Sequence, residues 1–304
     1  DVEEQLADIQ HIYSNQESFA AVRVDGSVVT WGGELWGNSS VVQDQLEDIL
    51  RIYSTNVAFA ALKATGGVVT WGGIVAGRSD SAKVRDQLAD IQHIYSTNFA
   101  FAALKSDGNV VTWGDAVAGG DSVEVRDQLA DVLCVYSNTV SFAAVRADGS
   151  VVTWGDALAG GDSMAVQDQL VEIQQIYSTN AAFAAMKHDG SIVIWGHARY
   201  GGECLALQSQ LVGILQVYST DGAFAAVKTN GTVLTWGHPE YGGDSEAVED
   251  QLSDILRIYS TGAAFAAVKA DDSVVVWGKA ASGGDLSAVQ DQLAHIRHIY
   301  STKG

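Results

Sequence analysis

The chain has 304 residues, and its 37 acidic against 17 basic side chains give it a formal net charge of −20 at pH 7. Proteins bind nucleic acids and anionic membranes largely through cationic side chains, so neither is expected as a partner. A negative charge of this size favours solubility, or steers a protein with a basic surface toward the chain. No apolar run approaches the ~18 residues that span a bilayer.

One unit is repeated along the whole sequence. A Trp-Gly pair recurs every 40 to 42 residues, and a Tyr-Ser pair follows the same rhythm. The tryptophans of these pairs are Trp31, Trp71, Trp113, Trp154, Trp195, Trp236 and Trp277. Because about 40 residues is the length of one propeller blade, the recurrence predicts seven blades.

Within one copy the pattern predicts three short strands, over residues 91–96, 101–105 and 110–113. Asp107-Gly108 joins the last two and suits a type I′ hairpin turn, in which both central residues have φ > 0. Two copies carry Thr65-Gly66 and Asp271-Asp272 at this place, and looser hairpins are predicted for them.

The middle strand is apolar on both faces. Phe101 and Ala103 point one way, whereas Ala102 and Leu104 point the other way. A strand covered on both sides belongs to a sheet that lies between two neighbouring sheets. We therefore predict an all-β fold, a seven-bladed β-propeller of seven ~41-residue repeats that closes into a ring and leaves no exposed sheet edge. An open solenoid is the alternative, but no distinct capping repeat is evident.

The segment between Trp-Gly and the next Gln-Leu is the least regular part of each copy, and all variation in repeat length falls there. Gly-Gly-Asp-Ser at 119–122 indicates a turn. Residues 123–129 suit either a short outer strand or one helical turn capped by Asp121 or Ser122, and we expect the helical turn.

Half a repeat is surplus. Gln-Leu occurs eight times, whereas Phe-Ala-Ala and Trp-Gly each occur seven times. The prediction is a single domain over residues 1–304 in which the half-repeats at 1–14 and 291–304 lie side by side and close the ring. Alternatively, one half-repeat pairs with another molecule and produces a homo-oligomer.

The stretch from Ala100 to Gly114, with its apolar strand, Asp-Gly hairpin, Val-rich strand and Trp-Gly, resembles the regulator of chromosome condensation repeat. The 41-residue period is similar to that of β-lactamase inhibitor protein II-like propellers. The resemblance covers the whole chain and implies the propeller fold. Proteins with these repeats include small-GTPase exchange factors and enzyme inhibitors, so the resemblance implies no single function.

A cation follows Phe-Ala-Ala-X in every copy and would form a ring of charge on one face. These residues are Arg23, Lys63, Lys105, Arg146, Lys187, Lys228 and Lys269. One interpretation is a site for an anion or an acidic peptide at the channel mouth. The favoured one is local pairing with an Asp of the hairpin or of Asp-Gln-Leu, since such surface pairs are common and weak.

The loops after Trp-Gly are the only places that break the repeat. Three of them carry an aromatic residue in equivalent positions, with charged residues or histidines nearby. The candidate binding residues are Trp36, Tyr200, Tyr241, His197, Arg199, His238 and Glu240. Aromatic side chains rimmed by charge are typical of protein interfaces. The alternative is loop variation, with each tyrosine packed on a neighbouring glycine.

No catalytic, cofactor or metal signature stands out, because the Ser, His and Asp residues repeat in phase and the histidines lack zinc-like spacing. We expect no enzymatic activity, no cofactor and no metal. The predicted function is a scaffold that binds a protein partner through loops on one face. One alternative is a designed or recently amplified propeller without an evolved ligand. A second, from the resemblance alone, is an exchange factor or an enzyme inhibitor. The compartment is left open.

Overall fold

The computed structural model describes residues 5–73 and 81–289, together with residues 293, 296 and 299–301. The beginning of the predicted half-repeat 1–14 and most of the half-repeat 291–304 therefore lie outside the described residues, and their proximity stays a prediction. The chain forms two compact units, one of Asp1–Ala147 with Val152–Ala157 and one of Asp148–Val151 with Leu158–Gly304.

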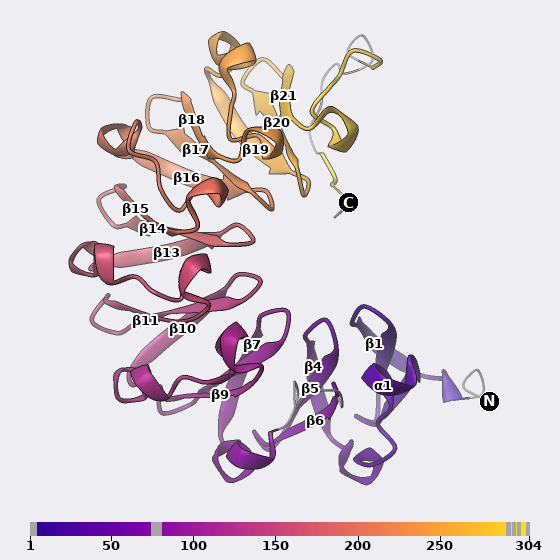
Figure 1. The fold of residues 1–304 in the computed structure, drawn as a ribbon. Coiled ribbons are helices and arrows are strands. Elements are labelled where there is room, and N and C mark those ends of the chain that lie inside the picture. The colour runs from indigo at the N-terminus through magenta and orange to yellow at the C-terminus, as the bar shows by residue number, and fades with distance from the viewer. Residues whose placement is uncertain (1–4, 74–80, 290–292, 294–295, 297–298, 302–304) are drawn as a thin grey trace. The chain divides into compact units, whose positions relative to one another are not determined.

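Each repeat folds into one three-stranded antiparallel sheet with its strands in sequence order, and the described residues form seven such sheets (Figure 1). The predicted fold class, a seven-bladed propeller, is confirmed, whereas closure of the ring stays a prediction. We number the sheets as blades one to seven. Their strands are β1 (Ile9–Ser14), β2 (Ser18–Arg23) and β3 (Val28–Gly32); β4 (Ile49–Ser54), β5 (Ala58–Lys63) and β6 (Val68–Gly72); β7 (Ile91–Ser96), β8 (Ala100–Lys105) and β9 (Val110–Gly114); β10 (Val132–Ser137), β11 (Ser141–Arg146) and β12 (Val151–Gly155); β13 (Ile173–Ser178), β14 (Ala182–Lys187) and β15 (Ile192–Gly196); β16 (Ile214–Ser219), β17 (Ala223–Lys228) and β18 (Val233–Gly237); β19 (Ile255–Ser260), β20 (Ala264–Lys269) and β21 (Val274–Gly278).

Short helical turns connect one blade to the next. After the third strand of a blade come α1 (Glu34–Gly37), η5 (Ala116–Gly120), η7 (Ala157–Ala159), η9 (Ala198–Tyr200), η11 (Pro239–Tyr241) and η13 (Ala280–Ser282). Before the next first strand come η2 (Gln43–Gln45), η4 (Ala82–Gln87), η6 (Val123–Gln128), η8 (Met164–Gln169), η10 (Gln208–Gln210) and η12 (Glu246–Gln251). The predicted helical turn after Gly-Gly-Asp-Ser is thus confirmed as a 3-10 helix. Of its two expected caps, Asp121 is the one whose carboxylate accepts a backbone hydrogen bond, from the N–H of Val123 at 3.0 Å.

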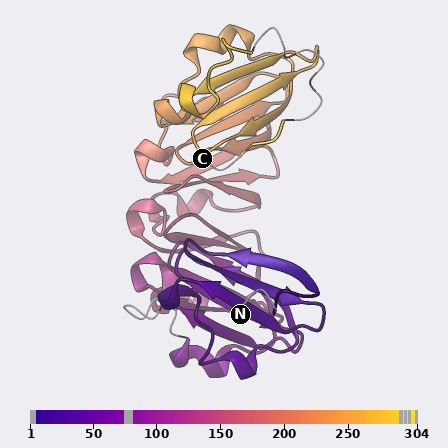
Figure 2. The same cartoon turned by 90° about the vertical axis from the view of Figure 1, so that its right-hand side faces the viewer.

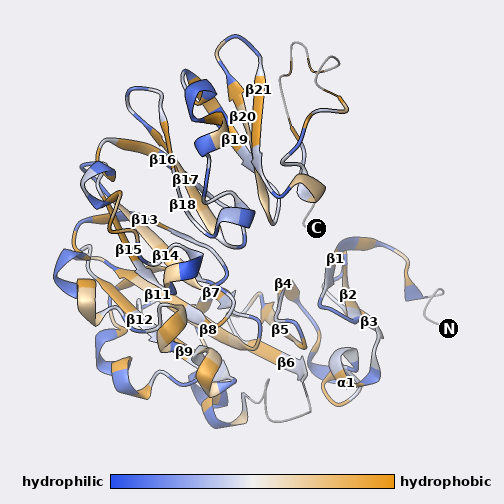
Figure 3. Ribbon diagram, turned by 45° about the horizontal axis from the view of Figure 1, so that its top comes forward, coloured by the Kyte–Doolittle hydropathy of each residue, from blue (hydrophilic) through white to orange (hydrophobic). Residues whose placement is uncertain are grey.

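The middle strands of blades two to six are buried on both faces, as their sequence predicts. Apolar residues follow the strands, while polar ones gather at the turns (Figure 3). Phe101 and Ala103 pack toward blade two, whereas Ala102 and Leu104 pack toward blade four. Each of these contacts therefore joins a small face, made of alanines and a Val, Leu or Met, to a large face. The large face carries Leu, two Ile or Val residues, Phe and Trp of its repeat.

The contact between blades six and seven shows how the two faces fit. Ala223, Ala225 and Val227 of β17 form the small face. From blade seven, Ile258, Phe265 and other residues of the large face pack against them. The small side chains let the sheets approach closely, and burial of each large apolar side chain stabilises the contact by roughly 1.5–3 kcal/mol. The same pattern joins the other neighbouring blades within each unit.

Backbone and hydroxyl groups also join neighbouring blades. In the second unit the N–H of Ile214 donates to the hairpin carbonyl of Gly190 in the preceding blade at 2.9 Å. In the first unit the hydroxyl of Ser96 donates to the carbonyl of Ser54 at 2.8 Å. These bonds lie at the ends of the short strands, which Figure 2 shows from the side. They fix the register of one sheet against the next.

The hairpin turns correct one prediction. Only the glycine of each Asp-Gly pair has positive φ, for example Gly108 at 81°, so the turns are not type I′. One left-handed residue is enough, because the N–H of Gly108 donates to the carbonyl of Lys105 and the N–H of Lys105 donates to that of Asn109. The hairpins at Gly66 and Asp272 make the same bonds and are not looser.

We predict that Asp272→Gly stabilises the protein. Asp272 has a φ of 66°, where the other hairpins carry glycine. A left-handed conformation costs an L-residue roughly 1–2 kcal/mol, and the added backbone freedom of glycine in the unfolded chain offsets part of the gain. We expect the free energy of unfolding in urea to rise by about 0.5–1 kcal/mol.

Asp271→Gly is the matched control, because Asp271 has no positive φ and its carboxylate accepts the N–H of Ser273 at 3.0 Å. This control should lower the stability. A stabilisation by Asp271→Gly, or none by Asp272→Gly, would contradict the assignment of strain to residue 272.

The buried tryptophans supply a second prediction. Trp236 Nε1 donates to the carbonyl of Gly201 at 3.1 Å, whereas Trp71 Nε1 is buried with no hydrogen-bond partner among the described residues. Replacing either ring with phenylalanine removes the same volume, but only Trp236→Phe leaves a buried carbonyl without its donor. We expect Trp236→Phe to cost about 1–2 kcal/mol more than Trp71→Phe in urea unfolding. Equal costs would show that the hydrogen bond contributes nothing.

Candidate functional site

The loops after the third strands of blades five and six each contain a capped 3-10 turn that ends in tyrosine. In η9 the Nδ1 atom of His197 accepts the N–H of Arg199 at 3.2 Å. In η11 His238 accepts the N–H of Glu240 in the same way, also at 3.2 Å. Blade three has Asp115 in this position, where its carboxylate accepts two backbone N–H groups. The two histidines are therefore helix caps in place of aspartate, and their Nδ1 atoms act as acceptors.

Each tyrosine ring is half-buried and has a fixed orientation. His197 meets Tyr200 edge-on with ring centroids 5.3 Å apart, and His238 meets Tyr241 at 5.0 Å. Tyr241 also lies over Gly222, since a Cβ on that glycine would be only 2.8 Å from Cγ of the ring. The alternative stated above, in which the tyrosine packs on a neighbouring glycine, thus explains the burial of one side of the Tyr241 ring. Tyr241 also packs against the core between blades six and seven, as Tyr200 packs against the core between blades five and six, so each ring is partly exposed.

The structure groups some of the predicted binding residues and not others. His197, Arg199 and Glu240 are exposed beside the two tyrosines, whereas His238 is buried. The two loops belong to neighbouring blades, and Gly201, directly after Tyr200, accepts a hydrogen bond from blade six. Trp36 lies in α1 of the first unit, where it packs on the core between blades two and three. Its grouping with the two tyrosines stays a prediction.

Several of the repeated cations have structural partners. Lys63 Nζ donates to the carbonyl of Gln45 at 3.0 Å, and Lys228 Nζ donates to that of Gln210 at 3.1 Å. Gln45 and Gln210 are the last residues of η2 and η10, where a cation complements the helix dipole. Arg23 also contacts the carbonyl of Gln5. Lys105 pairs with the hairpin carboxylate of Asp107 at 4.0 Å. These contacts favour a local role over an anion site.

Contacts made by the tyrosines of the Tyr-Ser pairs were not predicted from the sequence. Tyr53 and Tyr177 each contact the strand residue two positions before the tyrosine of the next blade. The hydroxyl of Tyr53 is 3.3 Å from His93 Nδ1, and Gln216 Nε2 donates to the hydroxyl of Tyr177 at 3.1 Å. The signal was present in the regular spacing of the tyrosines, 40 to 42 residues apart, but the variable residue at the contacting position concealed it.

The described residues contain no group of three or more His, Cys, Asp or Glu side chains that could hold a metal ion. No helix formed by the residues with a described placement is long and apolar enough to cross a membrane. Cys134 and Cys204 are both free thiols. Burial raises the pKa of the Cys134 thiol, which makes it less reactive.

No family model matches the chain, and no curated protein matches it. Solved structures that are similar include Prp20p from Saccharomyces cerevisiae, with 15% identity over 79% of this chain and 74% of that chain and a TM-score of 0.44. The CRINKLY WD40 ectodomain of the receptor kinase ACR4 from Arabidopsis thaliana has 12% identity over 89% and 97%, with a TM-score of 0.45. The computationally designed Ika8 protein has 13% identity over 89% and 83%, with a TM-score of 0.39.

Prp20 is the yeast RCC1. The Prp20p structure was described together with binding to Gsp1p and histones, which is a property of that protein. At such identities the similarity concerns the fold, and no function follows from it.

We predict that His93 makes the protein less stable in mild acid. Burial, and then the charge of Arg51, lower the pKa of His93 from its ordinary 6.5. Below pH 6.5, His93 therefore binds a proton in the unfolded chain but stays neutral in the folded one. The free energy of unfolding falls as the pH decreases toward the pKa of His93 in the folded protein. The melting temperature should drop more in wild type than in His93→Gln between about pH 7.5 and 5.5.

Glutamine is a suitable replacement because Gln175 and Gln216 occupy this position in blades five and six. Asp189→Asn serves as a control for acid effects elsewhere, since its carboxylate has a lowered pKa and titrates well below this range. An identical pH dependence in wild type and His93→Gln would contradict the prediction.

Proposed function

We propose that the chain is a non-enzymatic propeller scaffold that binds a protein partner through the loops after the third strands of blades five and six. The observation that carries the proposal is the matched pair of half-buried tyrosines, Tyr200 and Tyr241. Each is held against a capping histidine on a rigid frame. Rigid aromatic side chains give a large contact area at low entropic cost, and they are enriched among residues that dominate binding.

The charged residues around the tyrosine pair indicate what charge a partner would carry. Glu203, Glu240 and Asp244 are exposed in the two loops, and Arg199 is the basic residue among them. The whole chain carries a net charge of −20. A partner with a basic surface would be attracted over a long range, and its binding would weaken as salt screens the charges.

The uniformity of the frame supports a role for the loops. The strands repeat nearly the same residues, so their exposed parts offer one surface many times over. The loops differ between blades, and a partner that recognises one place on the molecule needs such a difference. A designed or recently amplified propeller without a ligand is the alternative that the similarity of the repeats favours.

We predict that Tyr200→Ala/Tyr241→Ala loses the partner without unfolding the protein. Alanine already occupies this position in blades three and four, at Ala118 and Ala159. Immobilised wild type and variant are incubated with an extract of the source organism, and bound proteins are quantified by mass spectrometry. We expect the amount of bound partner to fall about tenfold or more in the variant. High salt should reduce the bound amount further.

The matched control is Leu215→Gln/Leu256→Gln, which removes two exposed apolar side chains from the first strands of blades six and seven. Glutamine is the residue of other repeats at this position, for example Gln174. The control should bind like the wild type. A bound set that is the same for wild type and the tyrosine variant, or no specific binding at all, would refute the proposal and favour a propeller without a ligand.

A further inference from the structure

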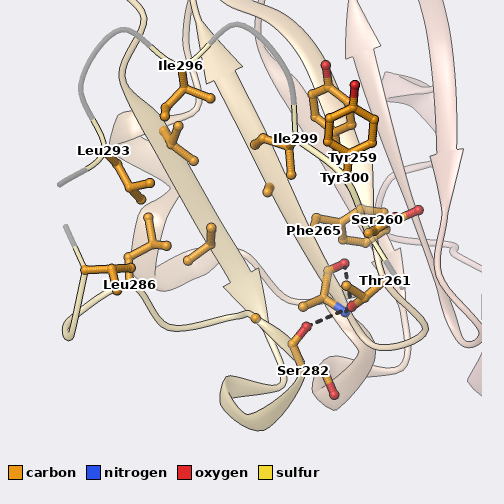
Figure 4. A pocket seen from close by; sticks show the side chains of 17 residues that line it. Tyr259, Ser260, Thr261, Phe265, Ser282, Leu286, Leu293, Ile296, Ile299 and Tyr300 are labelled. Carbon is orange, nitrogen blue, oxygen red and sulfur yellow. Dashed lines mark hydrogen bonds between the residues drawn. The ribbon is translucent and has the colours of Figure 1, made fainter. Parts of the chain in front are cut away.

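A cavity of about 390 Å³ lies beside blade seven, and Leu286, Leu293, Ile296 and Ile299 surround it (Figure 4). Several residues next to these along the chain lie outside the described residues, so we assign no ligand to the cavity. A basic cluster on the first strands of blades two and three consists wholly of described residues. Both strands belong to the first unit.

Tyr53 of β4 contacts two basic side chains. Its hydroxyl is 3.3 Å from His93 Nδ1 on β7, and the two rings meet edge-on with centroids 5.1 Å apart. Arg51 of β4 lies close enough to the Tyr53 hydroxyl for hydrogen bonding to raise the pKa of its guanidinium. Arg51 is also close to His93, since its charge, after burial, lowers the pKa of the imidazole. We call Arg51 and His93 the Arg51–His93 pair.

No acidic side chain neutralises this pair. Among the residues whose placement is described, Arg51 forms no ion pair, and no carboxylate is among the groups that shift its pKa. The groups that face His93 are Arg51 and Tyr53 from β4 and Tyr95 from its own strand, and Cys134 of β10 lies near Tyr95. The chain has 37 acidic residues, but none compensates these two basic side chains. An anion would complete such an environment.

The contact between the blades does not need a charged residue. In blade six the place of His93 is taken by Gln216, whose Nε2 donates to the hydroxyl of Tyr177 in blade five at 3.1 Å. An uncharged amide thus links neighbouring blades in the same way. The frame therefore requires neither the charge of Arg51 nor the ionisable ring of His93.

The free donors of the pair indicate the class of ligand. The charge of Arg51 makes the Tyr53 hydroxyl a better donor, so we assign the proton of this hydrogen bond to Tyr53 and the acceptor to His93 Nδ1. The proton of neutral His93 is then on Nε2, for which the described residues provide no acceptor. Arg51 is exposed, and its guanidinium can only donate. Two donors on adjacent blades suit a negatively charged group with several oxygen atoms.

We propose that Arg51 and His93 form an oxyanion site that binds a phosphate group. Arg51 donates to the phosphate oxygens through its guanidinium, and His93 donates through Nε2. The net charge of −20 opposes the approach of an anion, so inorganic phosphate should bind with a Kd of about 1–10 mM. Binding of the anion and protonation of His93 favour each other, because the anion balances the charge that the proton adds.

Inorganic sulfate is the first probe, because it keeps its charge between about pH 5 and 8, where histidine titrates. The titration of each histidine is followed by NMR in sulfate and in chloride of equal ionic strength. We expect sulfate to move the midpoint of the His93 titration upward by about one pH unit. By reciprocity, sulfate should bind about tenfold more tightly to the protein with protonated His93.

Arg51→Gln removes the guanidinium and introduces the residue that blades five and six carry at this position, Gln175 and Gln216. This variant should abolish the effect of sulfate on His93. Without sulfate it should raise the pKa of His93, because the neighbouring positive charge is gone. Arg257→Gln makes the same change at the equivalent position of blade seven. It is the matched control, and its His93 should respond to sulfate as in wild type.

The proposal is overturned by a His93 titration that is the same in sulfate and chloride, or by an equal response in Arg51→Gln. It is also overturned if the exposed His188 responds as His93 does, which would show a general effect of ions. Inorganic phosphate and phenyl phosphate are then compared in wild type at about pH 7. Tighter binding of phenyl phosphate would identify the ligand as an organic phosphate, and equal binding would identify it as the free ion. Both variants should melt close to wild type, since both arginines are exposed.

Discussion

The packing of a Phe–Trp pair against a glycine of the preceding connecting loop is the constraint on which blades four to seven depend. The ring edge of Phe265 approaches Gly242 so closely that a Cβ would clash with it, and Trp277 donates its indole N–H to the carbonyl of the same glycine. Only glycine tolerates both this contact and the positive φ that the loop requires there. The alanines of the middle strand follow from the same requirement, because larger side chains would hold the sheets apart.

The sequence predicts the frame well because the frame is repeated. Period-two alternation places Phe101 and Ala102 on opposite faces, and the structure confirms it. The first strand of that copy ends where expected, at Ser96. The turn type was wrong because Asp-Gly is compatible with several hairpins, and the residue pair alone does not specify how many of its members are left-handed. Asp272 shows the consequence, since aspartate adopts there the conformation that glycine adopts in other blades.

The candidate site was predictable in part. The positions of Tyr200 and Tyr241 follow from the break in the repeat, but their half-buried state depends on contacts such as that with Gly222, far away in the sequence. The capping role of His197 could have been inferred from Asp115, which occupies the same position after Trp-Gly. The partners of Lys63 and Lys228 could not, because a backbone carbonyl leaves no mark in the sequence.

The near identity of the contacts between blades also bears on how such a gene can change. Because β17 and β20 have the same sequence, blades six and seven present the same residues of their middle strands to whatever follows them. Unequal crossing-over between these two repeats would then add or delete a whole blade and leave the remaining junction matched. Loops that differ, such as those around Tyr200 and Tyr241, would be transferred together with their repeats. New surfaces could then arise from new combinations of existing loops.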